Sequence, residues 1–303
     1  MTRAPDVIAL GETMLSLVAV GVPLSAATVL HVTHGGAESN TCIGLVRLGF
    51  SAALVSRLGG DPAGARVASD LRDAGVDLRW VRVDPRRPTG LMLRETSGVP
   101  ARYHRADSAA SELSSADLDG VPVEEARAVV VTGITAMLGE GPRSAALALL
   151  ERGRGMRVVD PNLRSGLWGS HRARELVVPL LERADLILGG EGELGRLLGG
   201  RGRELTDRAH ALGAQEVVLK RGEQGAAASD GSGEWIEHRP PPYDDVDPVG
   251  AGDAFNAGYL AARLAGRPPG EALEQGARCG AAVATTVGDH AGFPALEEIG
   301  GAG

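Results

Sequence analysis

A short glycine-rich segment near the C-terminal end of the chain carries the residue types needed for group transfer. It reads Gly250-Ala251-Gly252-Asp253, and the Ala- and Leu-rich stretch 254–264 that follows predicts a helix. Free N–H groups at a helix N-terminus, together with the helix dipole, favour an anion such as a phosphate. Asp253 could then take a proton from an attacking hydroxyl while these N–H groups stabilise a phosphoryl group. The alternative is that Asp253 is an ordinary helix N-cap.

A second glycine motif lies early in the chain. Gly35 and Gly36 precede a predicted helix over 41–48, and Asn40 stands between them and that helix. Paired glycines allow a ligand to approach the backbone closely, and the Asn amide can both donate and accept hydrogen bonds. A turn followed by a helix cap explains the same pattern, so this motif alone does not predict a binding site.

The elements that must position these motifs alternate along the chain. We predict strands at 7–10, 52–56, 128–132, 157–159, 186–188 and 216–219, and helices at 63–74, 142–152, 171–183, 192–198 and 206–212. This alternation predicts right-handed crossovers and a mostly parallel sheet, which binds ligands beyond the carboxyl ends of its strands. The stretches 15–31, 89–95 and 101–105 predict short strands of a smaller sheet, the last two as a hairpin through Ser97 and Gly98.

Composition excludes several classes of protein. A chain of 303 residues with 43% hydrophobic content can bury a large core, and its net charge of -8 argues against nucleic acid as the main partner. Cys42 and Cys279 lack metal-ligand spacing and are typical of thiols in a reducing compartment. No targeting segment is visible and no apolar run is long enough to cross a bilayer, so we expect a cytoplasmic protein without a membrane partner.

The order of these motifs resembles that of the ribokinase-like (PfkB) carbohydrate kinase family. Supporting segments are Gly59 to Gly64, Gly133-Ile134, Asp160-Pro161-Asn162 and Lys220-Arg221-Gly222 with Gly225, so the resemblance spans essentially the whole chain. It implies a ribokinase-like α/β fold in a single domain over 1–303, with a mostly parallel central sheet flanked by helices. It also implies a small β-sheet lid with strands from about 12–33 and 89–106.

The resemblance assigns roles to particular residues. Asp253 resembles the catalytic base, and Gly250, Ala251 and Gly252 resemble the anion hole. ATP with Mg²⁺ is the implied cofactor, and the residues implied to bind it are Asn162, Lys220, Gly222, Gly225, Gly250 and Gly252. Asp247 matches the position that the family links to a monovalent cation such as K⁺, although capping the turn is an equally good role for it.

One element of the family's metal site departs from the pattern. Family members often carry an Asn-x-x-Glu element that organises Mg²⁺ through water. Here Gly190 stands at the Asn position, and only Glu193 remains. Mg²⁺ should still be needed, because the charge of the nucleotide phosphates must be neutralised.

Four further segments resemble the 2-keto-3-deoxygluconate kinases within this family. They are Tyr103-His104-Arg105, Asp160-x-Asn162-x-Arg164, Asp247-Pro248-Val249 and Gly288-Asp289-His290. Arg105 and Arg164 could converge on one carboxylate, which arginine recognises through paired donors. The substrate residues so implied are Gly35, Gly36, Asn40, Tyr103, Arg105, Arg164 and Asp289. Met92 departs from this branch, which more usually has an aromatic residue there.

The sequence therefore predicts ATP-dependent phosphorylation of the terminal hydroxyl of 2-keto-3-deoxygluconate. The alternatives are a neutral-sugar kinase of the fructokinase or ribokinase type, and a catalytically silent sugar- or nucleotide-binding regulator. A dinucleotide oxidoreductase is excluded, because no Gly-x-Gly-x-x-Gly follows the first strand. The configuration at C4 of the sugar acid and the choice of nucleotide stay open. Pairing of exposed lid strands between two copies would give a homo-oligomer.

Overall fold

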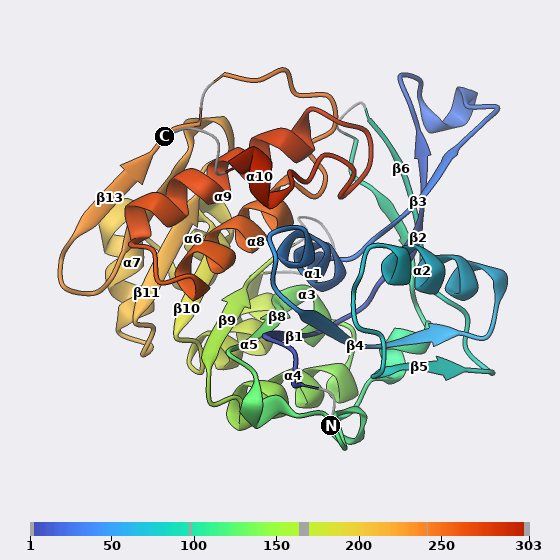
Figure 1. Ribbon diagram of the computed structural model, residues 1–303, viewed down its shortest axis with the longest axis horizontal. Helices are drawn as coiled ribbons and strands as arrows, with labels where there is room; N and C mark the ends of the chain where they lie inside the picture. Colours follow the sequence, from blue (N-terminus) through green and yellow to red (C-terminus); the bar gives the residue numbers. More distant parts are fainter. Residues whose placement is uncertain (1–2, 97–98, 164–169, 241, 300–303) are drawn as a thin grey trace.

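The computed structural model describes residues 3–96, 99–163, 170–240 and 242–299 (Figure 1). Its strands are β1 (Val7–Leu10), β2 (Met14–Ala19), β3 (His31–Gly35), β4 (Ala52–Gly59), β5 (Val81–Asp84), β6 (Leu91–Glu95), β7 (Arg102–His104), β8 (Ala128–Thr132), β9 (Met156–Asp160), β10 (Leu186–Gly190), β11 (Glu216–Lys220), β12 (Ala226–Ser229) and β13 (Trp235–His238). Its helices are α1 (Ala37–Arg47), α2 (Pro62–Asp73), α3 (Gly133–Ala136), α4 (Glu140–Arg152), α5 (Ser170–Leu181), α6 (Glu191–Leu198), α7 (Gly202–His210), α8 (Ala251–Leu264), α9 (Pro269–Ala284) and α10 (Leu296–Ile299).

The main sheet has nine strands in the order β13-β12-β11-β10-β9-β8-β1-β4-β5. The strands from β11 to β5 in this order run parallel, and β12 and β13 are added antiparallel at one edge. The mostly parallel α/β sheet expected from the sequence is therefore confirmed. Such a sheet brings the carboxyl ends of its parallel strands to a single edge, where ligands bind.

Both faces of the main sheet are covered, which explains why its central strands are apolar throughout. In β1, Ile8 and Leu10 join a core cluster that includes residues of α4, α5, α6 and α7. Val7 and Ala9 point the other way, into a cluster with residues of α1, α2, α8 and α9. A strand buried on both sides has no polar face to alternate with its apolar one. Figure 1 shows α1, α8 and α9 on one face of the sheet.

A second sheet of four strands, β3-β2-β6-β7, projects from the α/β body (Figure 1). We call it the small sheet. β2 pairs antiparallel with β3 and parallel with β6, and β6 pairs antiparallel with β7. The sequence prediction of paired strands at 89–95 and 101–105 is confirmed by the register Leu91↔His104. The predicted turn at Ser97 and Gly98 lies outside the described residues.

Three predicted helix starts were wrong by three or four residues. One is α7, which begins at Gly202 rather than 206, and the other two concern the glycine motifs. α1 begins at Ala37 rather than 41, so Asn40 lies in the first turn of the helix. α8 begins at Ala251 rather than 254, because Gly250 at φ +89° supplies the turn and the N-cap. Gly252 and Asp253 therefore belong to a helix, which orients them more rigidly than a loop would.

Three strands were not predicted. β5 and β13 are half-exposed, and β12 consists of Ala226-Ala227-Ala228-Ser229, residue types with a weak preference for strands. In the part of the chain that the structure describes, no helix combines the length and apolar character needed to cross a membrane.

Candidate active site

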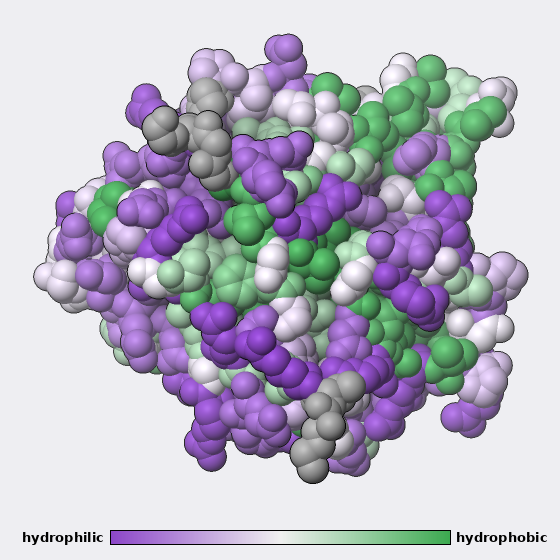
Figure 2. All heavy atoms as spheres, viewed as in Figure 1, coloured by the Kyte–Doolittle hydropathy of each residue, from purple (hydrophilic) through white to green (hydrophobic). Residues whose placement is uncertain are grey.

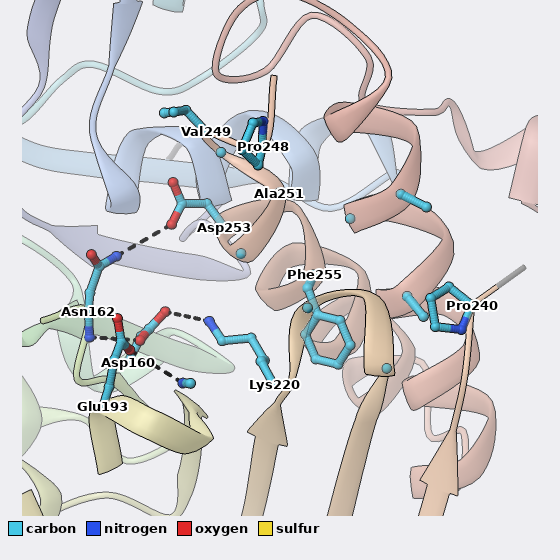
Figure 3. Close-up of a pocket in the computed structure, with 18 of the residues that line it drawn as sticks. Asp160, Asn162, Glu193, Lys220, Pro240, Pro248, Val249, Ala251, Asp253 and Phe255 are labelled. Carbon is cyan, nitrogen blue, oxygen red and sulfur yellow. Dashed lines mark hydrogen bonds and ion pairs between the residues drawn. The ribbon is translucent and has the colours of Figure 1, made fainter. Parts of the chain in front are cut away.

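The larger of two neighbouring cavities lies at the carboxyl ends of β9, β10 and β11 and holds about 470 Å³ (Figure 3). This volume suits a nucleotide-sized ligand. The residues that the sequence assigns to ATP or its metal all line it: Asn162, Glu193, Lys220, Gly222, Gly225, Gly250 and Gly252. Pro240 and Phe255 supply apolar surface (Figure 3).

The second cavity lies between the small sheet and the body. Its lining includes every described residue that the sequence assigns to the substrate: Gly35, Gly36, Asn40, Tyr103, Arg105 and Asp289. Arg164, assigned to the same ligand, lies outside the described residues. Met92 also lines the cavity, so the residue that departs from the family branch faces the site. The volume is only about 30 Å³, which is far below that of a typical small-molecule site.

Asp253 lines both cavities. It lies in the first turn of α8 and is only 5% exposed. Nδ2 of Asn40 donates to its Oδ2 at 2.8 Å, and Nδ2 of Asn162 donates to its Oδ1 at 3.5 Å. Figure 3 shows Asp253 and Asn162 pointing toward each other across the cavity. Two amide donors from separate elements therefore fix the orientation of this carboxylate between the cavities.

Gly250 and Gly35 owe their identity to close contacts with Asp289. A Cβ added at Gly250 would overlap the carbonyl oxygen of Asp289, and its φ of +89° also disfavours other residues. A Cβ added at Gly35 would overlap the Asp289 carboxylate. Gly35 of the early motif and Gly250 of the late motif therefore both lie against Asp289.

Lys220, at the end of β11, is held by two polar partners inside the larger cavity. Its Nζ donates to Oδ2 of Asp160 at 2.8 Å and to Oδ1 of Asn256 at 2.9 Å (Figure 3 draws the first contact). Nδ2 of Asn256 in turn donates to the same Asp160 oxygen at 2.6 Å. Sequence reasoning missed Asn256. The signal was its position three residues after Asp253, which puts both on one face of α8.

Arg105 is ion-paired in the structure. Its guanidinium contacts the carboxylate of Glu12, which is buried and also accepts a hydrogen bond from Oγ of Ser108 at 2.6 Å. The guanidinium also lies 5.5 Å from the centre of the Tyr103 ring, a cation–π distance. Glu12, which sequence reasoning did not select, therefore compensates the charge expected to bind a ligand carboxylate.

Arg94 is a buried arginine that sequence reasoning missed. Nη1 donates to both oxygens of Asp247 at 2.9 and 2.7 Å, and Nη2 donates to Oδ1 of Asp289 at 2.7 Å. Asp247, expected at a monovalent-cation site, lines neither cavity and contacts Arg94 instead. Strand alternation was the available signal, because Arg94 lies two residues after Met92 and shares its face of β6.

Two further carboxyls near the site have shifted pKa values. Complete burial raises the pKa of Glu38 in α1 to about 7, although the hydroxyls of Thr135 and Thr132 donate to it and partly offset the burial. Burial also raises the pKa of Asp289 to about 6, against the opposing effect of Arg94. Carboxyl groups with raised pKa values are common near catalytic centres.

The described residues contain no group of three or more His, Cys, Asp or Glu side chains arranged to hold a metal ion. Glu193 nevertheless lies in the larger cavity, where its Oε2 accepts a hydrogen bond from the N–H of Gly190 at 3.3 Å. A carboxylate oxygen in a cavity is the kind of group that Mg²⁺ contacts directly or through water.

Comparison with known proteins defines the class. Residues 4–296 match the model of the pfkB family carbohydrate kinases, and the chain belongs to this family. It is 32% identical over 306 residues to the 2-dehydro-3-deoxygluconokinase of Thermoproteus tenax, covering 95% of this chain and 94% of that protein. It is 34% identical over 297 residues to the 2-dehydro-3-deoxygalactonokinase of Haloferax volcanii, covering 94% and 93%. A solved structure of a putative ribokinase II from E. coli, in complex with ATP and Mg²⁺, matches with a TM-score of 0.90 at 25% identity over 98% of both chains.

Proposed function

We propose that this kinase transfers the γ-phosphoryl group of ATP to the terminal hydroxyl of a 2-keto-3-deoxy sugar acid, 2-keto-3-deoxygluconate in the first instance. The observation that carries the proposal is the place of Asp253, which borders both the nucleotide-sized cavity and the smaller one. The T. tenax and H. volcanii relatives, named for the gluconate- and galactonate-derived acids, support this class of substrate.

Asp253 acts as the general base. It takes the proton of the attacking hydroxyl as the new O–P bond forms to the γ-phosphorus and the bond to the β-phosphate oxygen breaks. Asn40 and Asn162 orient the carboxylate toward that proton. Gly250, Ala251 and Gly252 line the larger cavity at the start of α8, where the helix dipole stabilises the charge of the group in transfer. The N–H of Ala251 donates to the carbonyl of Pro248 at 3.2 Å, so the N–H groups of Gly250 and Gly252 are the donors for that group.

Nucleotide charge is balanced by groups in the larger cavity. Asp160 and Asn256 hold the ammonium group of Lys220 in place before a phosphate binds. Mg²⁺, when bound with ATP, neutralises phosphate charge, and Glu193 is the residue that would hold it through its water shell.

The substrate carboxylate is recognised by exchange of an ion pair. Arg105 leaves Glu12 and binds the carboxylate of the ligand, with Arg164 as the second cation. Tyr103 and Asp289, which line the same cavity, contact the hydroxyls. A neutral sugar offers Arg105 no group that replaces Glu12, which is why we favour a sugar acid.

The test is an ADP-release assay with ATP and Mg²⁺ over 2-keto-3-deoxygluconate, 2-keto-3-deoxygalactonate, gluconate, fructose and ribose. Turnover confined to the 2-keto-3-deoxy acids is the expected result. Comparison of the turnover of 2-keto-3-deoxygluconate with that of 2-keto-3-deoxygalactonate then identifies the configuration at C4 that the enzyme prefers. Turnover only with fructose or ribose would keep Asp253 as the base but refute the role of Arg105. If a folded protein that still binds ATP releases no ADP with any of the five compounds, the result would favour a sugar- or nucleotide-binding regulator.

Asp253→Asn tests the base directly. The amide keeps the shape of the side chain but cannot take a proton, so turnover should fall about 10²- to 10⁴-fold while ATP binding is kept. Near-normal turnover of this variant would refute the assignment.

We also propose that residues 1–303 act as one kinase domain that assembles as a homo-oligomer through the small sheet. Exposed valines gather on β3 and the segment that joins it to β2: Val20, Val22, Val29 and Val32. Figure 2 shows this apolar surface at the upper right, where β2 and β3 project. Covering it against a second copy removes apolar area from water. Sedimentation of the wild type and of Val29→Glu tests the proposal, and a wild-type monomer would refute it.

A further inference from the structure

Asp247 stands where the family resemblance leads us to expect a monovalent cation, yet its surroundings are those of a carboxylate already satisfied by donors. Nη1 of Arg94 lies 2.9 Å from Oδ1 and 2.7 Å from Oδ2. The N–H of Val249 donates to Oδ1 at 3.4 Å, and the N–H of Gly288 donates to Oδ2 at 3.0 Å. A carboxylate offers about four lone-pair sites. Each oxygen of Asp247 accepts two of these contacts, so little acceptor capacity is left for a cation.

The charge and the burial of the residues around Asp247 also argue against a bound cation. The side chains of Arg94 and Asp247 are each 1% exposed, and that of Asp289, the second partner of Arg94, is 3% exposed. A buried guanidinium this close to Asp247 would repel K⁺ strongly, because Coulomb energies are large where water is excluded. The residues present therefore do not fit a cation bound to Asp247.

The Arg94 contacts connect parts of the site that are far apart in sequence. Arg94 belongs to β6 of the small sheet, whereas Asp247 lies three residues before Gly250, the N-cap of α8. Asp289, the other partner, contacts Gly250 through its backbone and Gly35 through its carboxylate. One side chain thus connects the small sheet, the phosphate-binding turn and the glycine motif that ends β3.

We propose that Arg94 is a built-in replacement for the monovalent cation: its guanidinium neutralises Asp247, shapes the Gly250 turn and makes this chain independent of K⁺. Arg94 is a positioning residue, since it lines neither cavity and acts through Asp247 and Asp289. The inference goes beyond the proposed substrate and does not depend on it.

Thermal unfolding of the wild type in potassium and in tetramethylammonium chloride, at equal ionic strength, is the first test. An ion that binds only the folded state raises Tm, so a K⁺ site would appear as a shift of about 2 °C or more. We expect equal Tm values and, if the chain phosphorylates a substrate of the panel, equal turnover in the two salts. A K⁺-specific rise in Tm of the wild type would overturn the proposal even if no substrate is found.

Arg94→Ala is the second test, because it removes the guanidinium and leaves the space beside Asp247. This variant should gain a K⁺ response that the wild type lacks: a higher Tm in potassium than in tetramethylammonium, and K⁺-activated turnover. A merely structural arginine would not confer this response. If the variant folds and its Tm is the same in both salts, Arg94 does not stand in for a cation.

Arg57→Ala is the matched control. Arg57 of β4 forms an ion pair at 2.9 Å with Asp117, whose side chain is fully buried, and it lines neither cavity. Its loss should lower Tm equally in both salts. Should Arg94→Ala fail to fold, rubidium soaked into wild-type crystals decides the question by anomalous scattering. No peak at Asp247 is expected, and a peak there would refute the proposal.

Discussion

Asn40 of α1 donates a hydrogen bond to the carboxylate of Asp253 at 2.8 Å, although 213 residues separate the two in the chain. Each lies in the first turn of a helix that follows a glycine motif. α1 and α8 pack against the same face of the main sheet, and their residues share one core cluster. The contact therefore depends on the fold. It joins two glycine motifs, neither of which predicts a site alone, into one site.

The first prediction concerns this contact. Asn40→Ala removes the donor at 2.8 Å and leaves Asp253 with the longer contact to Asn162, so the carboxylate loses its fixed orientation. Misplacing a catalytic group in this way lowers kcat roughly 10- to 100-fold. Steady-state kinetics of ADP release measure it. Thr41→Ala is the control, because the Thr41 hydroxyl donates only to the carbonyl of Ala37 in the same helix and should leave kcat near the wild-type value.

The second prediction concerns Lys220. Lys220→Met removes the cation that neutralises Asp160, and the remaining carboxylate then repels the phosphates of ATP. We expect KM for ATP to rise about tenfold, with a smaller change in kcat. If the effect is electrostatic, adding Asp160→Asn to this variant should recover part of the loss. A double variant worse than the single one would show instead that Asp160 has a separate role in binding.

Much of this site could be predicted from the sequence because its motifs are local. Gly250 to Asp253 and Gly35 to Asn40 each combine glycines with a polar residue at a helix start, a pattern that a single stretch of chain displays. The described substrate and nucleotide residues so selected do line two adjoining cavities. Their roles in catalysis stay predictions.

The residues that were missed are those whose role depends on a partner far away in sequence. Arg94 meets Asp247 across 153 residues, and Glu12, between β1 and β2, meets Arg105, which follows β7. In a chain rich in arginine, composition gives no reason to select either pair. Only the folded arrangement distinguishes a buried arginine from one at the surface.

The third prediction is a pH dependence of stability that originates from Glu38. Its pKa rises from 4.5 to about 7 on folding because the side chain is fully buried. Below pH 4.5 the carboxyl is protonated in both states. Above it the unfolded chain loses the proton while the folded chain keeps it, so the free energy of unfolding falls until about pH 7.

Glu38→Gln isolates this contribution. The Gln Oε1 can still accept from Thr132 and Thr135, but the side chain no longer titrates. Relative to the wild type, the free energy of unfolding of the variant should increase by about 3 kcal/mol as pH rises from 4.5 to 7. Urea unfolding at each pH measures it. Asp289 titrates in the same direction, but it is present in both proteins, so its contribution cancels in the difference.

The last prediction separates two reasons why Gly250 must be glycine. Gly250 and Gly266 both have positive φ, at +89° and +78°, but an added Cβ meets backbone only at Gly250 and open space at Gly266. Gly266→Ala should therefore cost only the strain of a left-handed residue, about 1–2 kcal/mol. Gly250→Ala adds an overlap with the Asp289 carbonyl, so it should cost about 2–5 kcal/mol and displace the turn that we propose holds the transferring phosphoryl group. Chemical denaturation gives both free energies, and ADP release should fall sharply only for Gly250→Ala. Equal losses of stability, with activity kept in both variants, would mean that the Asp289 loop yields easily and does not shape the turn.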